Sequence, residues 1–237
     1  MQLHMKRFSL ILAAGVAAAI AVASVQGVSI AWKPKTGDTT KYKITTKASI
    51  QGQEMSFSAI LTSKVLEVTA DKVVVEEKQS DLNVKFGEQD FSSMMPASIT
   101  STTTMKLNGE VIERKSEMEE AGSQRMEAAL AHQYPDKQIE KGGTWVIKRA
   151  ANADKKLPAS EATYTYVEDE KVGAFDTWKI TYVFKETEGS TPMVVNGTIW
   201  LSRANGDPVK AVYKMQNVEF QEGMGTSDAE AEMTRID

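Results

Sequence analysis

The sequence contains no cysteine, and this absence excludes several classes of chemistry at once. Disulfide bonds, thiolate catalysis, cysteine-ligated zinc, iron–sulfur clusters and a lipid-anchored N-terminal cysteine all require the thiol. Histidine is nearly as scarce, with two residues in the whole chain. Metal sites and catalytic triads built on imidazole therefore have few candidates.

Positive charge is not in excess either. The chain has 28 Lys+Arg against 32 Asp+Glu, a net charge of −4, and its basic residues cluster in nothing longer than short pairs. Because nucleic-acid binding needs a basic surface, we expect no nucleic-acid partner. The Gly-x-Ser-x-Gly, His-Glu-x-x-His and phosphate-loop motifs are absent as well. We therefore predict no catalytic residue, no metal ion and no cofactor.

The start of the chain has the three-part layout of a signal peptide. Lys6-Arg7 precede an apolar run from Phe8 to Ala23 that ends in Ala21-Val22-Ala23. This run is shorter than the roughly 20 residues that cross a bilayer, although its extension to Val25 leaves a retained anchor as an alternative. We predict a signal peptide over residues 1–23, a linker over 24–36, and an exported protein, periplasmic or extracellular. Membrane contact would be transient or made through a retained N-terminal segment.

Residues 37–237 show a hydrophobic period of two far more often than a period of 3.6, which predicts one β-rich domain. The predicted strands are rich in Val, Ile, Thr and aromatic residues. The first begins at Tyr42. The others cover Ser56–Val68, Lys72–Val75, Thr102–Leu107, Thr144–Lys148, Ala162–Val167, Asp176–Phe184, Val194–Leu201 and Val209–Val218.

Two Asn-Gly pairs, Asn108-Gly109 and Asn205-Gly206, separate neighbouring strands and predict two-residue hairpins. Each pair closes a similar order of features, which begins with Gly37-Asp38-Thr39 in one case and Gly143-Thr144-Trp145 in the other. The hypothesis that follows is a duplicated β unit, with pseudo-repeats over residues 37–115 and 143–220.

One segment favours a helix. Ser116-Glu117-Met118-Glu119 matches a capping box, and Tyr134-Pro135 ends the run of helix-forming residues that follows. We predict a long helix over residues 117–133. The fold class predicted is mainly β with this one long helix: a large curved antiparallel sheet, half-barrel-like, with its concave face covered by the helix and by the loop Phe91–Pro96.

Ordinary structural roles explain the neighbouring acidic residues and His132, the one histidine that lies after the predicted signal peptide. His132 lies at the predicted end of the helix, where a cation interacts favourably with the last carbonyl groups, so a capping role accounts for it. Glu76 and Glu77 are adjacent on a strand and point to opposite faces. Glu168-Asp169-Glu170 falls between strands, where a solvated turn is the default.

Aromatic residues that alternate along the strands are the most suggestive feature for function. Rings with polar tips suit the mouth of an apolar pocket, and flexible Met side chains suit its cover. Packing in an ordinary β core is the alternative explanation. The predicted ligand-binding residues are Tyr164, Tyr166, Trp178, Tyr182, Trp200 and Tyr213 on the sheet, with Met118, Met126 and Leu130 on the helix.

The late segment Ile199-Trp200-Leu201-Ser202-x-x-Asn205-Gly206-x-Pro208-Val209-Lys210 resembles the outer-membrane lipoprotein carrier superfamily. Secreted bacterial proteins with two β repeats are similar too. The resemblance covers residues 196–216 and implies a half-barrel sheet that holds acyl chains beneath helices. Those carriers place a helix near the mature N-terminus, whereas this chain enters β structure after Trp32-Lys33-Pro34.

Three functions remain open at this point. The first is an exported envelope protein that binds a lipid or another hydrophobic small molecule without catalysis. The second is a structural or protein-interaction module of the envelope whose core is filled by its own side chains. The third is a hydrolase that uses carboxylates alone, which needs two acidic groups about 5 to 10 Å apart.

Overall fold

The computed structural model describes residues 27–117, 121–220 and 225–237. Nearly all regular structure is β. The strands are β1 Thr39–Ile50, β2 Gln53–Val68, β3 Val73–Phe86, β4 Gln89–Asp90, β5 Ser98–Met105, β6 Val111–Ser116, β7 Thr144–Arg149, β8 Ser160–Val172, β9 Phe175–Glu186, β10 Val194–Ser202, β11 Pro208–Val218 and β12 Ser227–Arg235. Two helical segments accompany them, the short 3₁₀ turn η1 Ser92–Met94 and the α-helix α1 Ala121–Leu130.

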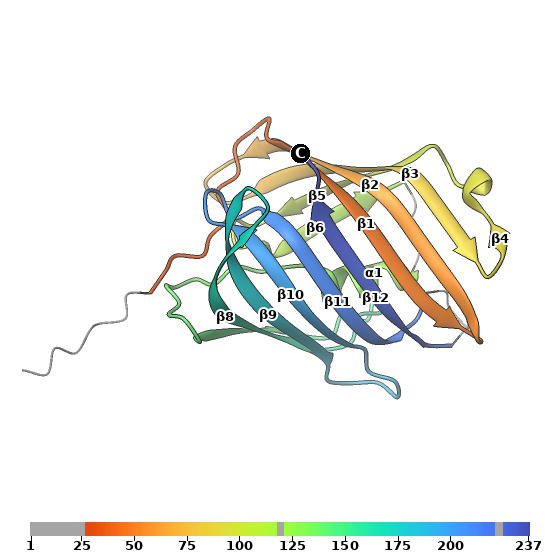
Figure 1. Ribbon diagram of the computed structural model, residues 1–237. Coiled ribbons are helices and arrows are strands. Elements are labelled where there is room, and N and C mark those ends of the chain that lie inside the picture. Colours follow the sequence, from red (N-terminus) through yellow and green to blue (C-terminus); the bar gives the residue numbers. More distant parts are fainter. Residues whose placement is uncertain (1–26, 118–120, 221–224) are drawn as a thin grey trace, which may run out of the picture.

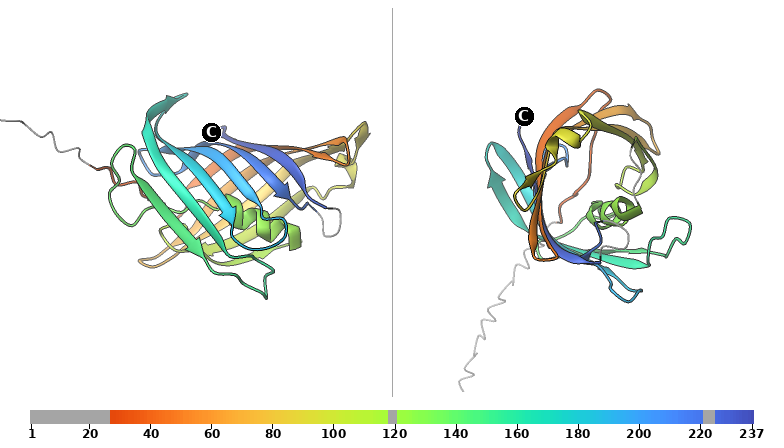
Figure 2. Two further views of the ribbon diagram at one scale, coloured as in Figure 1. Left: turned by 90° about the horizontal axis from the view of Figure 1, so that it is seen from below. Right: turned by 90° about the vertical axis from the view of Figure 1, so that its right-hand side faces the viewer.

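All twelve strands belong to one antiparallel sheet. Its order is β6-β5-β3-β2-β1-β12-β11-β10-β9-β8-β7, and β4 pairs with β3 beside this path. The sheet is strongly curved but open, because β6 and β7 each pair on one side only within the described residues. Figure 1 labels the strands, and the right-hand view of Figure 2, in which the curved sheet is seen end-on, shows α1 inside the curve near the gap between the two ends of the sheet. The predicted class, a large curved antiparallel sheet, is confirmed.

The predicted length of the helix is wrong. Ser116, the expected N-cap, is the last residue of β6 and pairs with Ser101. Glu117 continues this pairing, since its amide donates to the Thr100 carbonyl at 3.1 Å and its carboxylate accepts from the Thr100 amide at 2.8 Å. The groups that would start a helix at residue 117 are thus used by the sheet. The rest of the predicted capping box, residues 118–120, lies outside the described residues.

The helix also ends early, at Leu130, because groups from the sheet take its last carbonyls. The hydroxyl of Tyr182 donates to the Ala129 carbonyl, and that of Tyr164 donates to Ala131 at 3.3 Å. Arg149 donates to Ala128 at 3.1 Å. The final turn is therefore capped by β7, β8 and β9.

Both Asn-Gly hairpins form, with longer turns than predicted. Gly109 and Gly206 have φ of +85° and +82°, whereas neither asparagine has a positive φ, so the two-residue turn that needs both is not made. A Cβ on Gly109 would come within 2.5 Å of the His132 carbonyl oxygen, and one on Gly206 would collide with the Ala31 carbonyl. Glycine is therefore needed at both positions for turn conformation and for close backbone approach.

The two hairpins are docked in matching ways. The amide of Tyr134 donates to the Asn108 carbonyl, and the amide of Lys33 donates to the Asn205 carbonyl, each at 2.8 Å. Both donors precede a proline in the sequence. The hairpin of the first half is thus held by the segment just before the second half, and the hairpin of the second half by the segment just before the first half. These matching contacts are consistent with a duplicated β unit, which stays a hypothesis.

Core packing differs between the two halves. A large cluster of buried apolar residues fills the inner face of β8–β11 under the end of α1, whereas the inner face of β2 and β3 contributes the small cluster Val65, Val73 and Val75. The loop Phe91–Pro96 was predicted to help cover the concave face, but none of its residues lines the cavity on that face, and Met94 in it is 77% exposed. Among the described residues, no helix has the length and apolarity to cross a membrane. The predicted signal peptide lies outside them.

Candidate functional site

A cavity of about 1460 Å³ runs along the concave face of the sheet. It exceeds the roughly 300–1000 Å³ typical of small-molecule sites. Alternate residues of β1, β2 and β3 form much of its wall, because successive side chains of a strand point to opposite faces. These are Thr40, Tyr42, Ile44 and Thr46 of β1, Met55, Phe57, Leu61, Ser63 and Val65 of β2, and Val75, Glu77, Gln79 and Val84 of β3.

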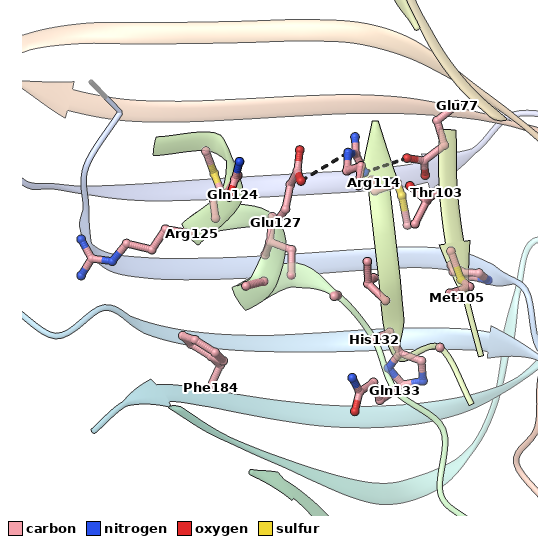
Figure 3. A pocket seen from close by; sticks show the side chains of 18 of the residues that line it. Glu77, Thr103, Met105, Arg114, Gln124, Arg125, Glu127, His132, Gln133 and Phe184 are labelled. Atoms are coloured by element: carbon pink, nitrogen blue, oxygen red, sulfur yellow. Dashed lines mark hydrogen bonds and ion pairs between the residues drawn. The ribbon is translucent and has the colours of Figure 1, made fainter. Parts of the chain in front are cut away.

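The cavity exists because this half of the sheet has small inward side chains and α1 does not reach across it. Ser63, Thr46 and Thr103 occupy inward positions where larger residues would fill the space. The wall that closes the cavity opposite these strands comes from α1 and from the His132–Tyr134 segment (Figure 3). Its surface is mainly apolar, although polar and charged side chains from several elements also line it.

In the other half of the concave face, the region around Tyr164 and Tyr182 is tightly packed, whereas Ile199 and Tyr213 line the cavity. Tyr164 and Tyr182 are 0% and 1% exposed, and the Tyr164 ring stacks on Trp145 with centroids 5.0 Å apart. Burial raises the pKa of the Tyr182 hydroxyl, which therefore stays protonated and donates to α1. These rings anchor the helix that bounds the cavity.

The residues predicted to bind a ligand divide into four groups, the last of which is Trp200 alone. Tyr213, Met126 and Leu130 line the cavity. Another four share its sheet face but lie in the packed half; they are Tyr164, Tyr166, Trp178 and Tyr182. Met118 lies outside the described residues. The ligand-binding role of the whole set stays a prediction.

Trp200 lies on the opposite, convex face. Its neighbours across β9 and β11 are Lys179 and Lys210, and the Nζ atom of each lysine is 5.9 Å from the indole centroid. The next residue toward the N-terminus, Ile199, lines the cavity instead. The alternation along β10 thus turns Trp200 away from the concave side.

One cluster of charged groups in the cavity wall centres on Arg114 of β6. Its Nη1 donates to Glu77 of β3 at 3.1 Å, and its Nε lies 3.3 Å from Glu127 of α1 (Figure 3). Burial raises the pKa of Glu127, a change that Arg114 opposes and Glu77 reinforces. Beside this trio Thr103 is 2% exposed, and its hydroxyl has no hydrogen-bond partner among the described residues. Two carboxylates here share one guanidinium.

A second ion pair fixes the middle of α1. Arg125 donates to both carboxylate oxygens of Glu186, at 2.6 and 2.5 Å, and Glu186 also accepts from the Met193 amide at 2.6 Å. Glu186 is 1% exposed. Such a bidentate, buried pair is directional and holds the helix against β9.

The capping role predicted for His132 is wrong. Its imidazole is enclosed by the rings of Tyr134, Tyr164 and Trp145, with centroid distances of 4.6, 5.1 and 6.5 Å. Burial lowers the pKa of His132 to about 3, so the ring is neutral near pH 7 and is no cation for a helix end. Arg149 takes that position instead. Among the described residues no group of three or more His, Cys, Asp or Glu side chains converges as a metal site would require.

The sequence reasoning missed the residues of the hollow half, above all Glu77, Arg114 and Glu127. The available signal was the alternation Phe57-x-x-x-Leu61-x-Ser63-x-Val65, which places small and apolar residues on one face of β2. Nothing local in the sequence brings Arg114 to Glu77, because their strands are joined through β5.

Comparison with known proteins gives little beyond fold likeness. No protein-family profile matches the chain, and no curated protein does. Among solved structures, a candidate exported protein with a YmcC-like fold from Bacteroides fragilis is similar, with 12% identity, a TM-score of 0.35, and coverage of 89% of this chain and 100% of that one. A domain of a candidate outer membrane lipoprotein-sorting protein from Vibrio parahaemolyticus matches with 12% identity, a TM-score of 0.23 and 86% of each chain. At these TM-scores the function must be argued from the chain's own residues.

Proposed function

We propose that this chain is an exported protein that binds an apolar or amphipathic, lipid-like ligand in the cavity and performs no chemistry on it. The observation that carries the proposal is the cavity itself, about 1460 Å³ beneath a helix anchored at its middle, through Arg125, and at its C-terminal end. Burial of an acyl chain there contributes about 0.8 kcal/mol per methylene, which supplies affinity without any catalytic group. Export rests on the leader-like residues 1–23.

The hollow half supports this function over a filled structural module. A module that only packed against itself would gain from larger side chains at Ser63 and Thr103, because unfilled space forfeits dispersion contacts. The anchoring of α1 supports it as well, since a rigid wall keeps a cavity open when no ligand is bound. Partnership with another envelope protein stays a prediction.

The test is binding of a neutral fluorescent probe such as N-phenylnaphthylamine, whose emission rises in apolar surroundings. Wild-type protein should bind it saturably. The double variant Leu61→Trp/Ser63→Trp fills the cavity from β2 and should weaken binding at least about tenfold, which corresponds to about 1.4 kcal/mol.

Thr62→Trp is the matched control, since Thr62 lies between these positions and points to the convex face. It should leave binding unchanged. Failure of the wild-type protein to bind the probe, or an equal loss in the control, would overturn the proposed function and favour the filled module.

A further inference from the structure

The polar region around Arg114 contains more negative than positive charge. Glu77 and Glu127 both approach the one guanidinium, and their side chains are 27% and 38% exposed, toward the cavity that they line. Arg114 makes an ion pair with each of them but can neutralise only one negative charge. With both acids ionised, the trio carries one uncompensated negative charge in a partly buried place.

The other cations of the cavity wall, Arg125, Lys148, Arg149 and Lys155, form no ion pair with Glu77 or Glu127. Arg125 is held by Glu186, and Lys148 lies 3.2 Å from Glu161. Arg149 donates to the carbonyl groups at the end of α1, where the helix dipole is negative. The charge imbalance is therefore local to the trio.

A second observation points to a ligand at the same place. Thr103 faces Arg114 across the β5–β6 ladder, its side chain is almost wholly buried, and its hydroxyl oxygen has no partner among the described residues (Figure 3). Leaving a buried hydroxyl unpaired costs about 1–3 kcal/mol. Three acceptor groups, two carboxylates and one hydroxyl, thus lie beside Arg114 in one part of the wall.

We propose that this trio and Thr103 form a polar subsite of the cavity, and that this subsite takes an amphiphile whose head is a cationic amine. This inference rests on the proposed function. An ammonium group has three donors and no acceptor, which matches the two carboxylates and the Thr103 oxygen. A carboxylate or phosphate head would meet Glu77 and Glu127 as like charges and is disfavoured there.

The experiment compares three straight-chain amphiphiles of equal length, dodecylamine, dodecanol and dodecanoate, as competitors of the neutral probe on the full chain at about pH 7. At this pH the amine is protonated and the acid is ionised. The amine should displace the probe at a concentration at least about tenfold below that of dodecanoate, with the alcohol between them.

The double variant Glu77→Gln/Glu127→Gln keeps the side-chain shapes and removes both charges. It should reduce the ratio between amine and carboxylate to near one or invert it, while probe affinity is retained. Glu76→Gln is the control, because Glu76 is adjacent on β3 and points to the other face. It should keep the wild-type ratio.

The outcomes separate the two proposals. Equal displacement by all three amphiphiles, or preference for dodecanoate, in wild-type protein overturns the amine subsite and leaves the proposed function standing. A ratio unchanged in the Glu77→Gln/Glu127→Gln variant also overturns the subsite. Absence of probe binding in the wild type overturns both.

Discussion

At the scale of single residues, His132 makes stability depend on pH. Its imidazole is buried among three rings and its pKa falls to about 3, against about 6.5 in an unfolded chain. In the pH range between these values the unfolded state binds the proton and the folded state does not. The contribution to stability is therefore complete above pH 6.5 and is lost as the pH falls toward 3.

We predict that the free energy of unfolding decreases by about 4 kcal/mol more in wild-type protein than in His132→Phe as the pH is lowered from 7 to 3. Phenylalanine keeps an aromatic ring in the cage and cannot take up a proton. Urea unfolding of both proteins at several pH values measures the difference. Parallel pH curves for the two proteins would show that the imidazole is not buried in this cage.

The type of a residue alone does not show whether it binds a ligand, and this limited the prediction of the site from the sequence. Aromatic residues attracted the ligand prediction, yet Tyr164 and Tyr182 bind the helix end, and Trp200 lies on the convex face. The cavity depends on small inward residues such as Ser63, which read as surface positions in a strand. The cavity is space that inward side chains leave unfilled, and a local sequence pattern does not show how much space the fold encloses.

At the scale of elements, the two docked hairpins are the most demanding junctions. Gly206 combines a positive φ with a backbone neighbour, the Ala31 carbonyl, whereas Gly173 has a positive φ of +58° and open space around it. A methyl group at either position is strained by the left-handed backbone, by about 1–2 kcal/mol. At Gly206 it must also displace the segment that docks the hairpin.

We predict that Gly206→Ala lowers the free energy of unfolding by about 3 kcal/mol or more, and Gly173→Ala by about 1 kcal/mol. The comparison separates close approach from backbone strain, because both substitutions add the same methyl group. Urea denaturation with matched slopes is the measurement. Equal losses for the two variants would mean that the Ala31 segment does not pack on this hairpin.

Elements differed in how well the sequence predicted them. Most long strands follow from alternating hydrophobicity, since a half-buried strand needs that period. β12 was missed, because the Ala- and Glu-rich segment Ser227–Arg235 favours a helix locally, yet it is paired on both sides, with β1 and β11. The helix was predicted too long because its expected cap, Ser116, is part of β6 and pairs with β5 instead.

At the scale of the whole molecule, the chain builds one curved sheet whose halves do different tasks. The half made by β8–β11 is packed and holds α1, and the half made by β1–β3 and β5 is hollow against it. Strand order was not predictable, because the strands that join the halves, β1 and β12, come from opposite ends of the domain. The open sheet and its interior helix together produce the cavity.

The most direct test of this account is a crystal structure of the protein with a bromine-tipped straight-chain alcohol, recorded at the bromine absorption edge. We predict an anomalous peak inside the concave face, between the inner side chains of β1 and β2 and the helix α1. A peak confined to the outer surface, or a concave face filled by the protein's own side chains, would contradict it.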